Sequence, residues 1–366
     1  MITSSKIAPL PVSLSKDIAN LANERDAKNG VSAIDIERLR ESGLLPLIVP
    51  KEYGGIGATW TEALKVVQEI AASDGLTGQL YGNHLNLSVL AHVLGTSEQK
   101  QRYYQQTLET KGFWANAIDT WDTRLKISQD GDNFRLNGVR KFDPVVAAAD
   151  LRVFSALPDQ GEPIFLIIPQ DRAGIIANNN LGFEQNQSNL ATFTFHNVFI
   201  KRSEILATPK PNAQAFSSFL GVIAQLTKTY VYLGIAQGTL EAAHSTGKTS
   251  EVDSTMQDPC VLGDYGNLWL ELKTAIELAD EVADIVQALW EKELTVTEQE
   301  RSQVAIAIFA AEAFATRVGW EISNRLFKHG GTCSQPDRLR DLQSFGGVSM
   351  PWKGAPQNWT VNCLPQ

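Results

Sequence analysis

The apolar residues of this chain change their spacing twice, and this change limits the folds that the sequence can adopt. Residues 12–110 follow a helical period, short runs of period two begin at about residue 112, and a helical period returns after Pro211. Helical spacing gathers apolar side chains on one helix face, whereas alternation gathers them on one face of a strand. The order predicts helices, then strands, then helices again.

Two helices can be placed in the first segment. We expect a short amphipathic helix closed by Gly43, with an apolar face made of Ile34, Ile36, Leu39 and Leu44. A second helix can be capped by Thr61, since a threonine hydroxyl accepts a hydrogen bond from a free amide of the first turn. Its apolar residues are Leu64, Val66, Val67 and Ile70.

The middle segment predicts strands. Runs rich in aromatic and β-branched residues lie at 134–138, 151–155, 164–169 and 191–195. Because no helical pattern separates these runs, an antiparallel barrel or sandwich is the expected arrangement.

The last helical segment consists of long stretches at 213–246, 260–290 and 296–328. Asp258-Pro259 separates the first two, and Thr295-Val296-Thr297-Glu298 supplies a helix start for the third. One protomer cannot cover all of their apolar surface, so we expect a homo-oligomer, specifically a homotetramer built as a dimer of dimers.

The predicted fold class is therefore α+β, in four parts. These are an N-terminal helical domain (1–110), a middle antiparallel β-barrel or sandwich (111–210), a C-terminal helical bundle (211–330) and an irregular tail (331–366). The tail is rich in Gly, Pro and Trp and has no helical period. It is either a natural divergent ending or the product of a frameshift.

Composition excludes several classes of partner. With 32 Lys and Arg against 41 Asp and Glu, the net charge of −9 disfavours nucleic acid and anionic membranes. The longest apolar runs are shorter than the roughly 20 residues of a membrane span. The three cysteines (Cys260, Cys333 and Cys363) are too far apart for a disulfide framework or a metal site. We expect a cytoplasmic protein without a signal peptide.

Several phrases resemble a known family over roughly residues 15–332. Pro50-Lys51-Glu52-Tyr53-Gly54-Gly55-Ile56-Gly57 and Gly95-Thr96-Ser97-Glu98-Gln99-Lys100 resemble the N-terminal helical domain of the acyl-CoA dehydrogenase superfamily. Three further phrases resemble its dibenzothiophene-monooxygenase-like, flavin-dependent branch: Gly82-Asn83-His84-Leu85, Trp114-Ala115-Asn116-Ala117, and Leu136-Asn137-Gly138-Val139-Arg140-Lys141-Phe142.

The resemblance implies a flavin, FMN or FAD, and a set of residues around it. His84 corresponds to a histidine over the flavin edge, and a pKa near 6.5 suits a catalytic proton carrier. The alternative for His84 is a half-buried histidine that is hydrogen-bonded in a packing face of its helix. Asn116 can face the alternating donors and acceptors of the flavin ring, or it can be a turn-forming residue. The cofactor-binding residues implied are Trp114, Asn116, Ala117, Phe142, Asp143, Gln185, Ser188 and Lys248.

The chain also departs from the family pattern near the flavin. Asp143-Pro144 follows Phe142 where the branch has a small hydroxyl or thiol residue and a glycine, and Asn186 replaces an arginine. Lys248 stands alone where an arginine-rich phrase holds the flavin phosphate, and lysine lacks the bidentate fork of arginine. These changes predict weakened flavin binding.

The missing carboxylate base decides between reaction types. An acyl-CoA dehydrogenase needs such a base, and its alternative position on the 213–246 helix is occupied by Lys228 or Thr229. The sequence therefore favours a two-component monooxygenase that takes reduced flavin from a flavin reductase and oxidises a small organosulfur or related substrate. The alternatives are an FAD-dependent acyl-CoA dehydrogenase and a degenerate member that keeps only the fold and the oligomer interface.

Overall fold

The computed structural model describes residues 14–20, 33–119, 122–142, 145–178, 191–206, 214–246 and 259–329. The chain forms two compact units. Among the described residues, the helical unit combines those within 14–20, 58–82 and 222–329, and the β unit combines those within 33–57 and 83–221. Both units are thus assembled from segments that are far apart in the sequence. The four-part division by chain order stays a prediction.

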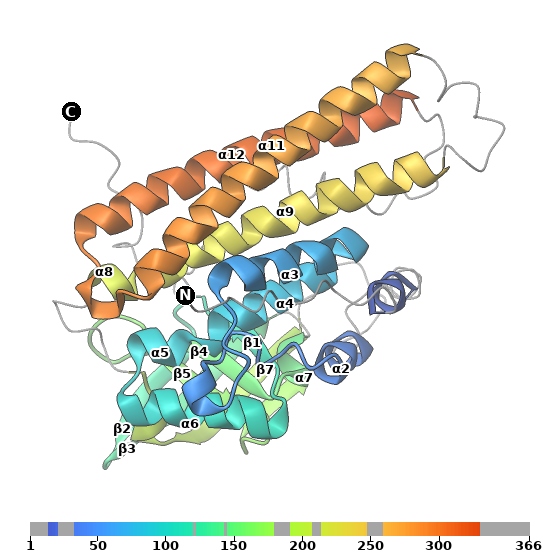
Figure 1. Ribbon diagram of the computed structural model, residues 1–366. Coiled ribbons are helices and arrows are strands. Elements are labelled where there is room, and N and C mark those ends of the chain that lie inside the picture. The colour runs from blue at the N-terminus through green and yellow to red at the C-terminus, as the bar shows by residue number, and fades with distance from the viewer. Residues whose placement is uncertain are drawn as a thin grey trace. The chain divides into compact units, whose positions relative to one another are not determined.

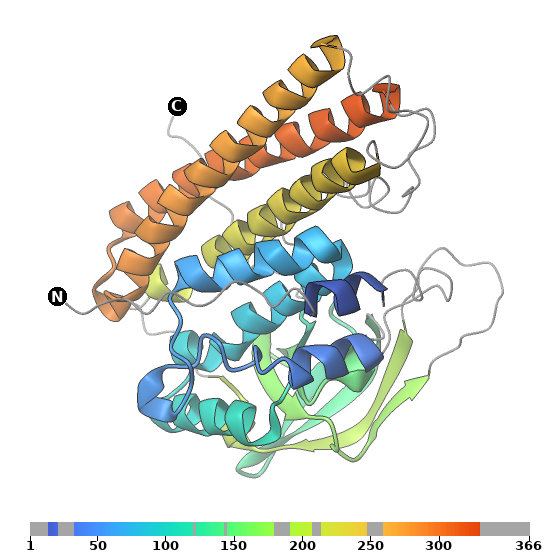
Figure 2. The ribbon, with the colours of Figure 1, turned by 45° about the vertical axis from the view of Figure 1, so that its right-hand side comes forward.

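The helical unit is built around three long helices of its described part. These are α9 (Phe219–Thr246), α11 (Pro259–Trp290) and α12 (Glu298–His329), and they lie side by side in both views (Figures 1 and 2). The unit also contains α3 (Trp60–Ser73) and the first half of α4 (Gly75–Ser88). The predicted start of α12 is confirmed, because the Thr297 hydroxyl accepts from the Glu300 amide at 3.2 Å and the Thr297 amide donates to the Glu300 carboxylate at 3.0 Å.

The predicted cap of α3 is wrong by two residues. Thr59 is the capping residue, and its hydroxyl accepts from the Glu62 amide while the Glu62 carboxylate accepts from the Thr59 amide. This reciprocal pair satisfies two amides that lack helical partners. Thr61 instead donates its hydroxyl to Asp284 of α11 at 2.7 Å, which ties α3 to the bundle.

Glycines bring α9 close to its neighbours. A Cβ at Gly234 would overlap the backbone oxygen of Gln68 on α3 and would lie 2.7 Å from the Cβ of Ala71. A Cβ at Gly82 of α4 would lie 2.6 Å from Cγ2 of Thr227 on α9. Beside these contacts, Tyr230 of α9 donates to Asp280 of α11 at 2.6 Å. The helix axes can approach this closely only because these positions lack side chains.

The close approach at Gly234 leads to a first prediction. Gly234→Ala should destabilise the protein by about 1–3 kcal/mol or more, because the methyl group meets rigid backbone of α3. The matched control is Gly266→Ala on α11, where nothing lies within 4 Å of the added carbon. That control should be neutral or stabilising by up to about 1 kcal/mol, since alanine is the better helix former. Urea unfolding of both variants measures the difference, and equal stabilities would contradict the packing described.

The β unit contains a strongly curled sheet that helices cover. Its described strands are joined in the order β1-β4-β2-β3-β7-β6, and β5 pairs with β4. The bounds are β1 (Trp114–Ala117), β2 (Lys126–Asp130), β3 (Asn133–Phe142), β4 (Leu151–Pro158), β5 (Ile164–Pro169), β6 (Ile175–Asn178) and β7 (Ala191–Ile200). The predicted strands are all present, and the expected order of N-terminal helices, middle β domain and C-terminal helical bundle is confirmed. The middle domain, expected as an antiparallel barrel or sandwich, is a curled half-barrel. Two pairings, β1 with β4 and β2 with β4, are parallel.

The covering helices of the β unit come mainly from the N-terminal part of the chain. They are α2 (Ala33–Glu41), the second half of α4, α5 (Leu90–Leu94), α6 (Ser97–Thr110), α7 (Val145–Ala148) and α8 (Gln214–Ser217), with single turns η1 (Lys51–Tyr53) and η2 (Arg202–Glu204). The expected helix closed by Gly43 corresponds to α2, and Gly43 has a φ of 72° that glycine adopts readily.

The two N-terminal family phrases have structural explanations. In the first, Gly54 ends η1 with a φ of 93°, and a Cβ at Gly55 would overlap the carbonyl oxygen of Val49. In the second, the Thr96 hydroxyl accepts from the Gln99 amide, and Gln99 Nε2 donates to the backbone oxygens of Ser203 and Ile205. Both phrases therefore fix turns and a helix start.

The most apolar helix is long enough to cross a membrane. Residues Ala215–His244 have a window of mean hydropathy 1.3, and 78% of that window is buried inside the structure. Core helices of globular proteins have the same composition, and α9 packs against α3, α4 and α11 through the contacts above.

Candidate functional site

The start of β1 is held by a buried histidine. His84 on α4 is fully buried, its Nδ1 accepts from the Trp114 amide at 3.1 Å, and its Nε2 contacts the Leu45 oxygen at 2.8 Å. A carbonyl can only accept, so Nε2 carries the proton and the ring is neutral. The ring also stacks on Phe113, with centroids 5.4 Å apart and planes 13° from parallel.

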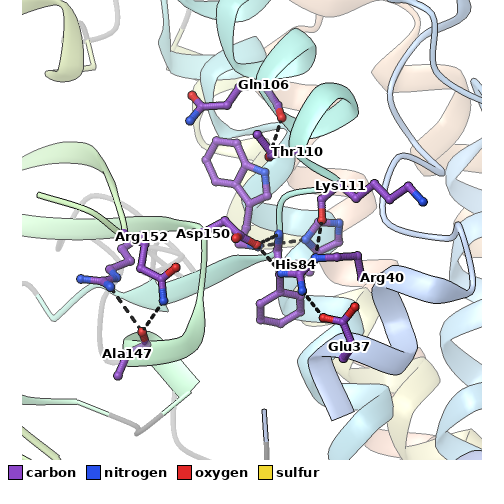
Figure 3. A network of polar contacts seen from close by, with 12 residues as sticks. Glu37, Arg40, His84, Gln106, Thr110, Lys111, Ala147, Asp150 and Arg152 are labelled. Carbon is purple, nitrogen blue, oxygen red and sulfur yellow. Dashed lines mark hydrogen bonds and ion pairs between the residues drawn. The ribbon is translucent and has the colours of Figure 1, made fainter. Parts of the chain in front are cut away.

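The ion pair between Asp150 and Arg40 holds Phe113, the residue before Trp114. Asp150 accepts from the Phe113 amide at 2.7 Å and from Arg40 of α2 at 2.7 Å (Figure 3). Arg40 also donates to the Lys111 oxygen at 3.2 Å and pairs with Glu37. Asp150 returns a bond through its own amide to the Phe113 oxygen at 3.0 Å. α2, α4 and the segment before β4 therefore position the first residues of β1.

The geometry favours a positioning role for His84 over the predicted catalytic one. Burial lowers the pKa of His84 from 6.5 to about 4, outweighing the opposite effects of the Leu45 carbonyl and Asp150. A neutral ring whose two nitrogens both bond the backbone has no proton position left for a ligand. Its catalytic role stays a prediction, and one that requires His84 to leave these bonds.

The indole of Trp114 is part of the core. The side chain is fully buried, Nε1 donates to the Thr107 hydroxyl at 2.9 Å, and the ring packs edge-on against Tyr103 at 5.8 Å. Ala117 is buried as well. These contacts leave no face of the Trp114 indole open for stacking on a flavin. The predicted cofactor role of both residues is untested, and any contact they make with a flavin would have to come from their backbone.

Asn116 combines both of its predicted roles. The residue is half-buried, and Oδ1 accepts from the Ile118 amide at 2.8 Å, which forms the turn at the end of β1. Within the described part of the chain, Nδ2 has no hydrogen-bond partner. The side chain therefore offers a fixed donor, since the turn holds Oδ1 in place.

Phe142 lies at the end of β3 in an aromatic cluster. Its ring contacts Phe154 at 5.4 Å and Phe193 at 5.5 Å, both at angles near 66°. Phe154 in turn packs edge-on against Phe195 at 5.3 Å. Edge-to-face packing is favourable for aromatic rings, so these contacts hold Phe142 in the interior of the curled sheet.

Sequence reasoning missed Arg140, which holds the segment after β1. Arg140 is buried, donates to the Ser155 oxygen at 2.9 Å and to the Asp122 oxygen, and its Nε lies 3.6 Å from the Asp122 carboxylate. The Ser155 hydroxyl also accepts from the Asp119 amide at 2.9 Å. The alternation of Leu136, Arg140 and Phe142 on the buried face of β3 was the available signal.

The space next to Arg140 is too small for a flavin. The hollow bordered by Asp119, Asp122, Thr123, Arg140, Ser155, Ala156, Leu157 and Pro163 encloses essentially no volume. Pockets for small molecules usually exceed roughly 300 Å³. This cluster therefore supports the segment that follows Asn116 and is not itself a cofactor site.

A second buried arginine, Arg152, was also missed. Its Nη2 donates to the Ala147 oxygen of α7 at 3.3 Å, and Gln170 donates to the same oxygen at 3.0 Å (Figure 3). Its Nε is buried without a hydrogen-bond partner among the described residues, and burial lowers its pKa. Arg152 is therefore a buried cation that bonds α7, the helix that begins three residues after Phe142, and one of its nitrogens has no hydrogen-bond partner among the described residues.

Several predicted residues lie outside the described part of the chain. These are Asp143, Gln185, Ser188 and Lys248, together with Asn186 and the tail from residue 331. Their roles stay predictions.

The absence of a carboxylate at the expected base position of α9 has a structural context. The Thr229 hydroxyl is bonded to the Gln225 oxygen of its own helix at 3.0 Å. Lys228 lies 3.2 Å from Glu312 of α12 and 5.2 Å from the centroid of Tyr232. Glu312 also accepts from Gln225. The nearby carboxylate is thus engaged by a cation and an amide.

The sequence matches known proteins along most of its length. Residues 13–111 match the family described as the acyl-CoA dehydrogenase, N-terminal domain. Dibenzothiophene monooxygenase of Rhodococcus erythropolis is 33% identical over 349 residues, covering 87% of this chain and 83% of the relative. The chain belongs to the acyl-CoA dehydrogenase superfamily. A probable FMNH2-dependent monooxygenase of Pseudomonas putida, SfnC, is 32% identical over 339 residues, with 89% and 85% covered.

Solved structures agree with this membership of the superfamily. Methanesulfinate monooxygenase MsuC of Pseudomonas fluorescens superposes with a TM-score of 0.84 at 32% identity, covering 93% of this chain and 92% of that one. Dibenzothiophene monooxygenase TdsC of Paenibacillus sp. A11-2, solved with FMN and indole, gives 0.80 at 30% identity, with 91% and 89% covered. The predicted branch is therefore confirmed, because these superfamily members are flavin-dependent monooxygenases.

The pKa of His84 leads to a second prediction. Between pH 6.5 and 4 the unfolded chain binds a proton at His84 that the folded chain does not, so stability falls as the pH is lowered through this window. The loss attributable to His84 is about 3 kcal/mol. His84→Gln keeps a donor and an acceptor but cannot titrate. Between pH 7 and pH 4 the free energy of unfolding of the variant should therefore fall by about 3 kcal/mol less than that of the wild type.

Urea unfolding of both proteins at pH 7 and pH 4 tests this prediction. The carboxylates Asp122 and Glu300, whose pKa values hydrogen bonds lower to about 2, are present in both proteins, so their contribution to the pH dependence cancels in the comparison. Identical pH profiles for the two proteins would show that folding leaves the pKa of His84 unchanged, which would contradict the burial of a neutral ring.

Proposed function

We propose that this protein is a monooxygenase that uses reduced FMN and oxygen to oxidise a small organosulfur or related compound. The supporting observation is the similarity to flavin-dependent monooxygenases at 32–33% identity over 87–89% of the chain. Relatives that are acyl-CoA dehydrogenases match less: one from Bacillus subtilis is 24% identical over 251 residues. The engaged Glu312 carboxylate near Lys228 also argues against proton abstraction from a thioester.

FMN is the proposed cofactor because relatives are described with FMN or FMNH2. Reduced flavin supplies the electrons and the ring at which oxygen is activated. The donor set of the β unit fits such a ring in one respect. The Nδ2 of Asn116 is fixed and has no described partner, and a carbonyl oxygen of the flavin is a suitable acceptor for it.

The other residues of the site act on this donor from a distance. His84 and Asp150 fix the start of β1, and Arg140 with Ser155 fixes the segment that follows its end. Asn116 is thereby held from both sides in an orientation set before any ligand arrives. Such preorganisation avoids the cost of ordering the side chain during binding.

The remaining parts of the proposal concern partners and location. Reduced FMN would come from a separate flavin reductase, and the substrate class follows from the sulfur compounds named for the relatives. We retain the expected homotetramer and the cytoplasmic location as parts of this proposal. The runner-up is a degenerate member that keeps the fold but binds no flavin, favoured by Asp143-Pro144 in the sequence.

A third prediction tests the reaction itself. Purified protein supplied with FMN, NADH and a flavin reductase should oxidise methanesulfinate or dibenzothiophene, the compounds named for the relatives, with oxygen incorporated from ¹⁸O₂. Mass spectrometry of the products measures the incorporation, and the reductase alone is the control. If the protein binds reduced FMN saturably in the absence of oxygen but forms no product in the assay, the proposed substrate class is wrong and the proposed cofactor is not. Absence of binding at millimolar FMN by folded protein would favour the degenerate alternative.

A fourth prediction concerns Asn116. Asn116→Asp keeps the oxygen that accepts from the Ile118 amide but replaces the Nδ2 donor with a charged acceptor. Affinity for FMN should fall about 10- to 100-fold, because a donor is lost and the carboxylate repels a carbonyl oxygen. Asn137→Asp is the matched control, since its Oδ1 likewise accepts from a backbone amide, that of Asn197, at 2.7 Å. Isothermal titration that finds equal affinities for the two variants would remove Asn116 from the FMN site.

A further inference from the structure

The first part of α9 is enclosed on every side but one. Among residues 222–236, all are buried except Ala224, Gln225 and Lys228, which are half-buried. Lys228 lies four residues after Ala224 and three after Gln225, so the three side chains share one face of the helix. The partly open face of this helix therefore combines one small side chain with two hydrogen-bond donors.

The two polar side chains of this face hold a single carboxylate. Lys228 Nζ lies 3.2 Å from Oε1 of Glu312 on α12, and Gln225 Nε2 donates to Oε2 of the same group. Both oxygens of Glu312 are thus bound by donors from successive turns of α9. This pair of donors is therefore spaced to bind an acid group that has two oxygens on one atom.

Lys228 is charged and has a third donor. Burial disfavours the ammonium form, but the interactions with Tyr232 and Glu312 outweigh this effect and raise the pKa of Lys228. A lysine ammonium has three N–H donors, of which Tyr232 and Glu312 take two in the described part of the chain. The side chain is 36% exposed, so a ligand can approach the third donor from the open face of α9.

Stability alone does not require this ion pair. The Glu312 side chain is only 17% exposed, and taking two charges out of water costs about as much as their attraction returns. A pair of apolar side chains can therefore stabilise a helix contact equally well. The neighbouring residues of α12 that face the bundle are apolar, since Ile308, Ala311 and Ala315 are all buried. The charged pair of Lys228 and Glu312 therefore points to a role other than holding α9 to α12.

We propose that Gln225 and Lys228 form a binding site for the acid group of a small organic anion, a sulfinate or a carboxylate. Glu312 occupies this site as an internal stand-in, and an incoming anion displaces it. Sulfinates and carboxylates share the required chemistry, because both spread one negative charge over two oxygens of one atom. The site itself does not depend on the proposed reaction. The choice of a sulfinate rests on that reaction, because methanesulfinate is named for the relative MsuC.

The exchange of Glu312 for a ligand conserves the charge of the site. The ligand brings one negative charge to Lys228, and the released carboxylate turns toward the solvent that already reaches it. Because Glu312 competes with the ligand, the measured dissociation constant exceeds the intrinsic one by the reciprocal of the fraction of molecules in which the site is open. Removing the charge of Glu312 should therefore strengthen binding, whereas removing the charge of Lys228 should weaken it.

Two substitutions with opposite expected effects test the site. Isothermal titration of the full-length protein with methanesulfinate and with acetate should show saturable binding of at least one of them, and uncharged acetamide should not bind. Lys228→Met should weaken the binding about 10- to 100-fold, because a charge-assisted hydrogen bond is lost. Glu312→Gln should tighten it about tenfold, because an uncharged amide competes less for Lys228.

Lys65→Met is the matched control for the loss of a cation. Lys65 lies 3.0 Å from Asp280, so this variant breaks another ion pair between two helices of the bundle, and its affinity should equal that of the wild type. Circular dichroism checks the folding of each variant. A misfolded protein does not bind more tightly, so the Glu312→Gln result stands even if Lys228→Met fails to fold. Folded wild-type protein that binds neither anion at tens of millimolar, or a Glu312→Gln variant with wild-type affinity, would overturn the proposal.

The same variants separate this inference from the proposed function. Binding of methanesulfinate that depends on Lys228, in a protein that forms no product with reduced FMN, would support the site and reject the proposed reaction. Oxidation of methanesulfinate with the same KM in the wild type and in Lys228→Met would support the reaction and reject the site. Binding of acetate alone would support the site and reject the sulfinate as its ligand.

Discussion

The bond between the Trp114 amide and His84 is the contact on which the candidate site depends. A backbone amide buried at the start of a strand must find an acceptor, because an unpaired buried polar group costs about as much as a lost hydrogen bond. Here the acceptor is a neutral imidazole whose other nitrogen donates to the Leu45 oxygen. One side chain thus joins α4, the segment after α2 and β1. The direction in which β1 leaves this junction determines where Asn116 lies.

The same solution recurs elsewhere in the β unit. Arg140 donates to the backbone oxygens of Ser155 and Asp122, and Gln99 donates to those of Ser203 and Ile205. In each case a long polar side chain from a helix or strand donates to backbone oxygens of other elements or of the segments that connect them. The curled sheet can therefore have close, irregular connections without losing hydrogen bonds. Residues that resemble catalytic or binding positions in the sequence can then have this supporting function in the structure.

The sequence predicted the architecture well because the apolar spacing acts over whole elements. The long helices α9, α11 and α12 and the strands β4, β5 and β7 lie where the pattern places them. Which of two nearby threonines caps α3 was harder to predict, because Thr59 and Thr61 can both accept a hydrogen bond from a backbone amide. Thr59 is the cap, and Thr61 bonds Asp284, which is distant in the sequence. The site was harder still. Whether His84 faces a ligand or the backbone depends on Leu45 and Trp114, which are 39 and 30 residues away and carry no sequence signal for it.

The helical unit joins α3, from the first quarter of the chain, to α9, α11 and α12, which come more than 150 residues later. During synthesis, α3 leaves the ribosome long before its partners exist. At about 5–20 residues per second, the wait until α12 is complete lasts on the order of 10–50 s. The β unit, whose described strands all precede α9, can form in that interval. Its assembly would leave the apolar face of α3, with Leu64, Val67 and Ile70, open to chaperones or to other nascent chains.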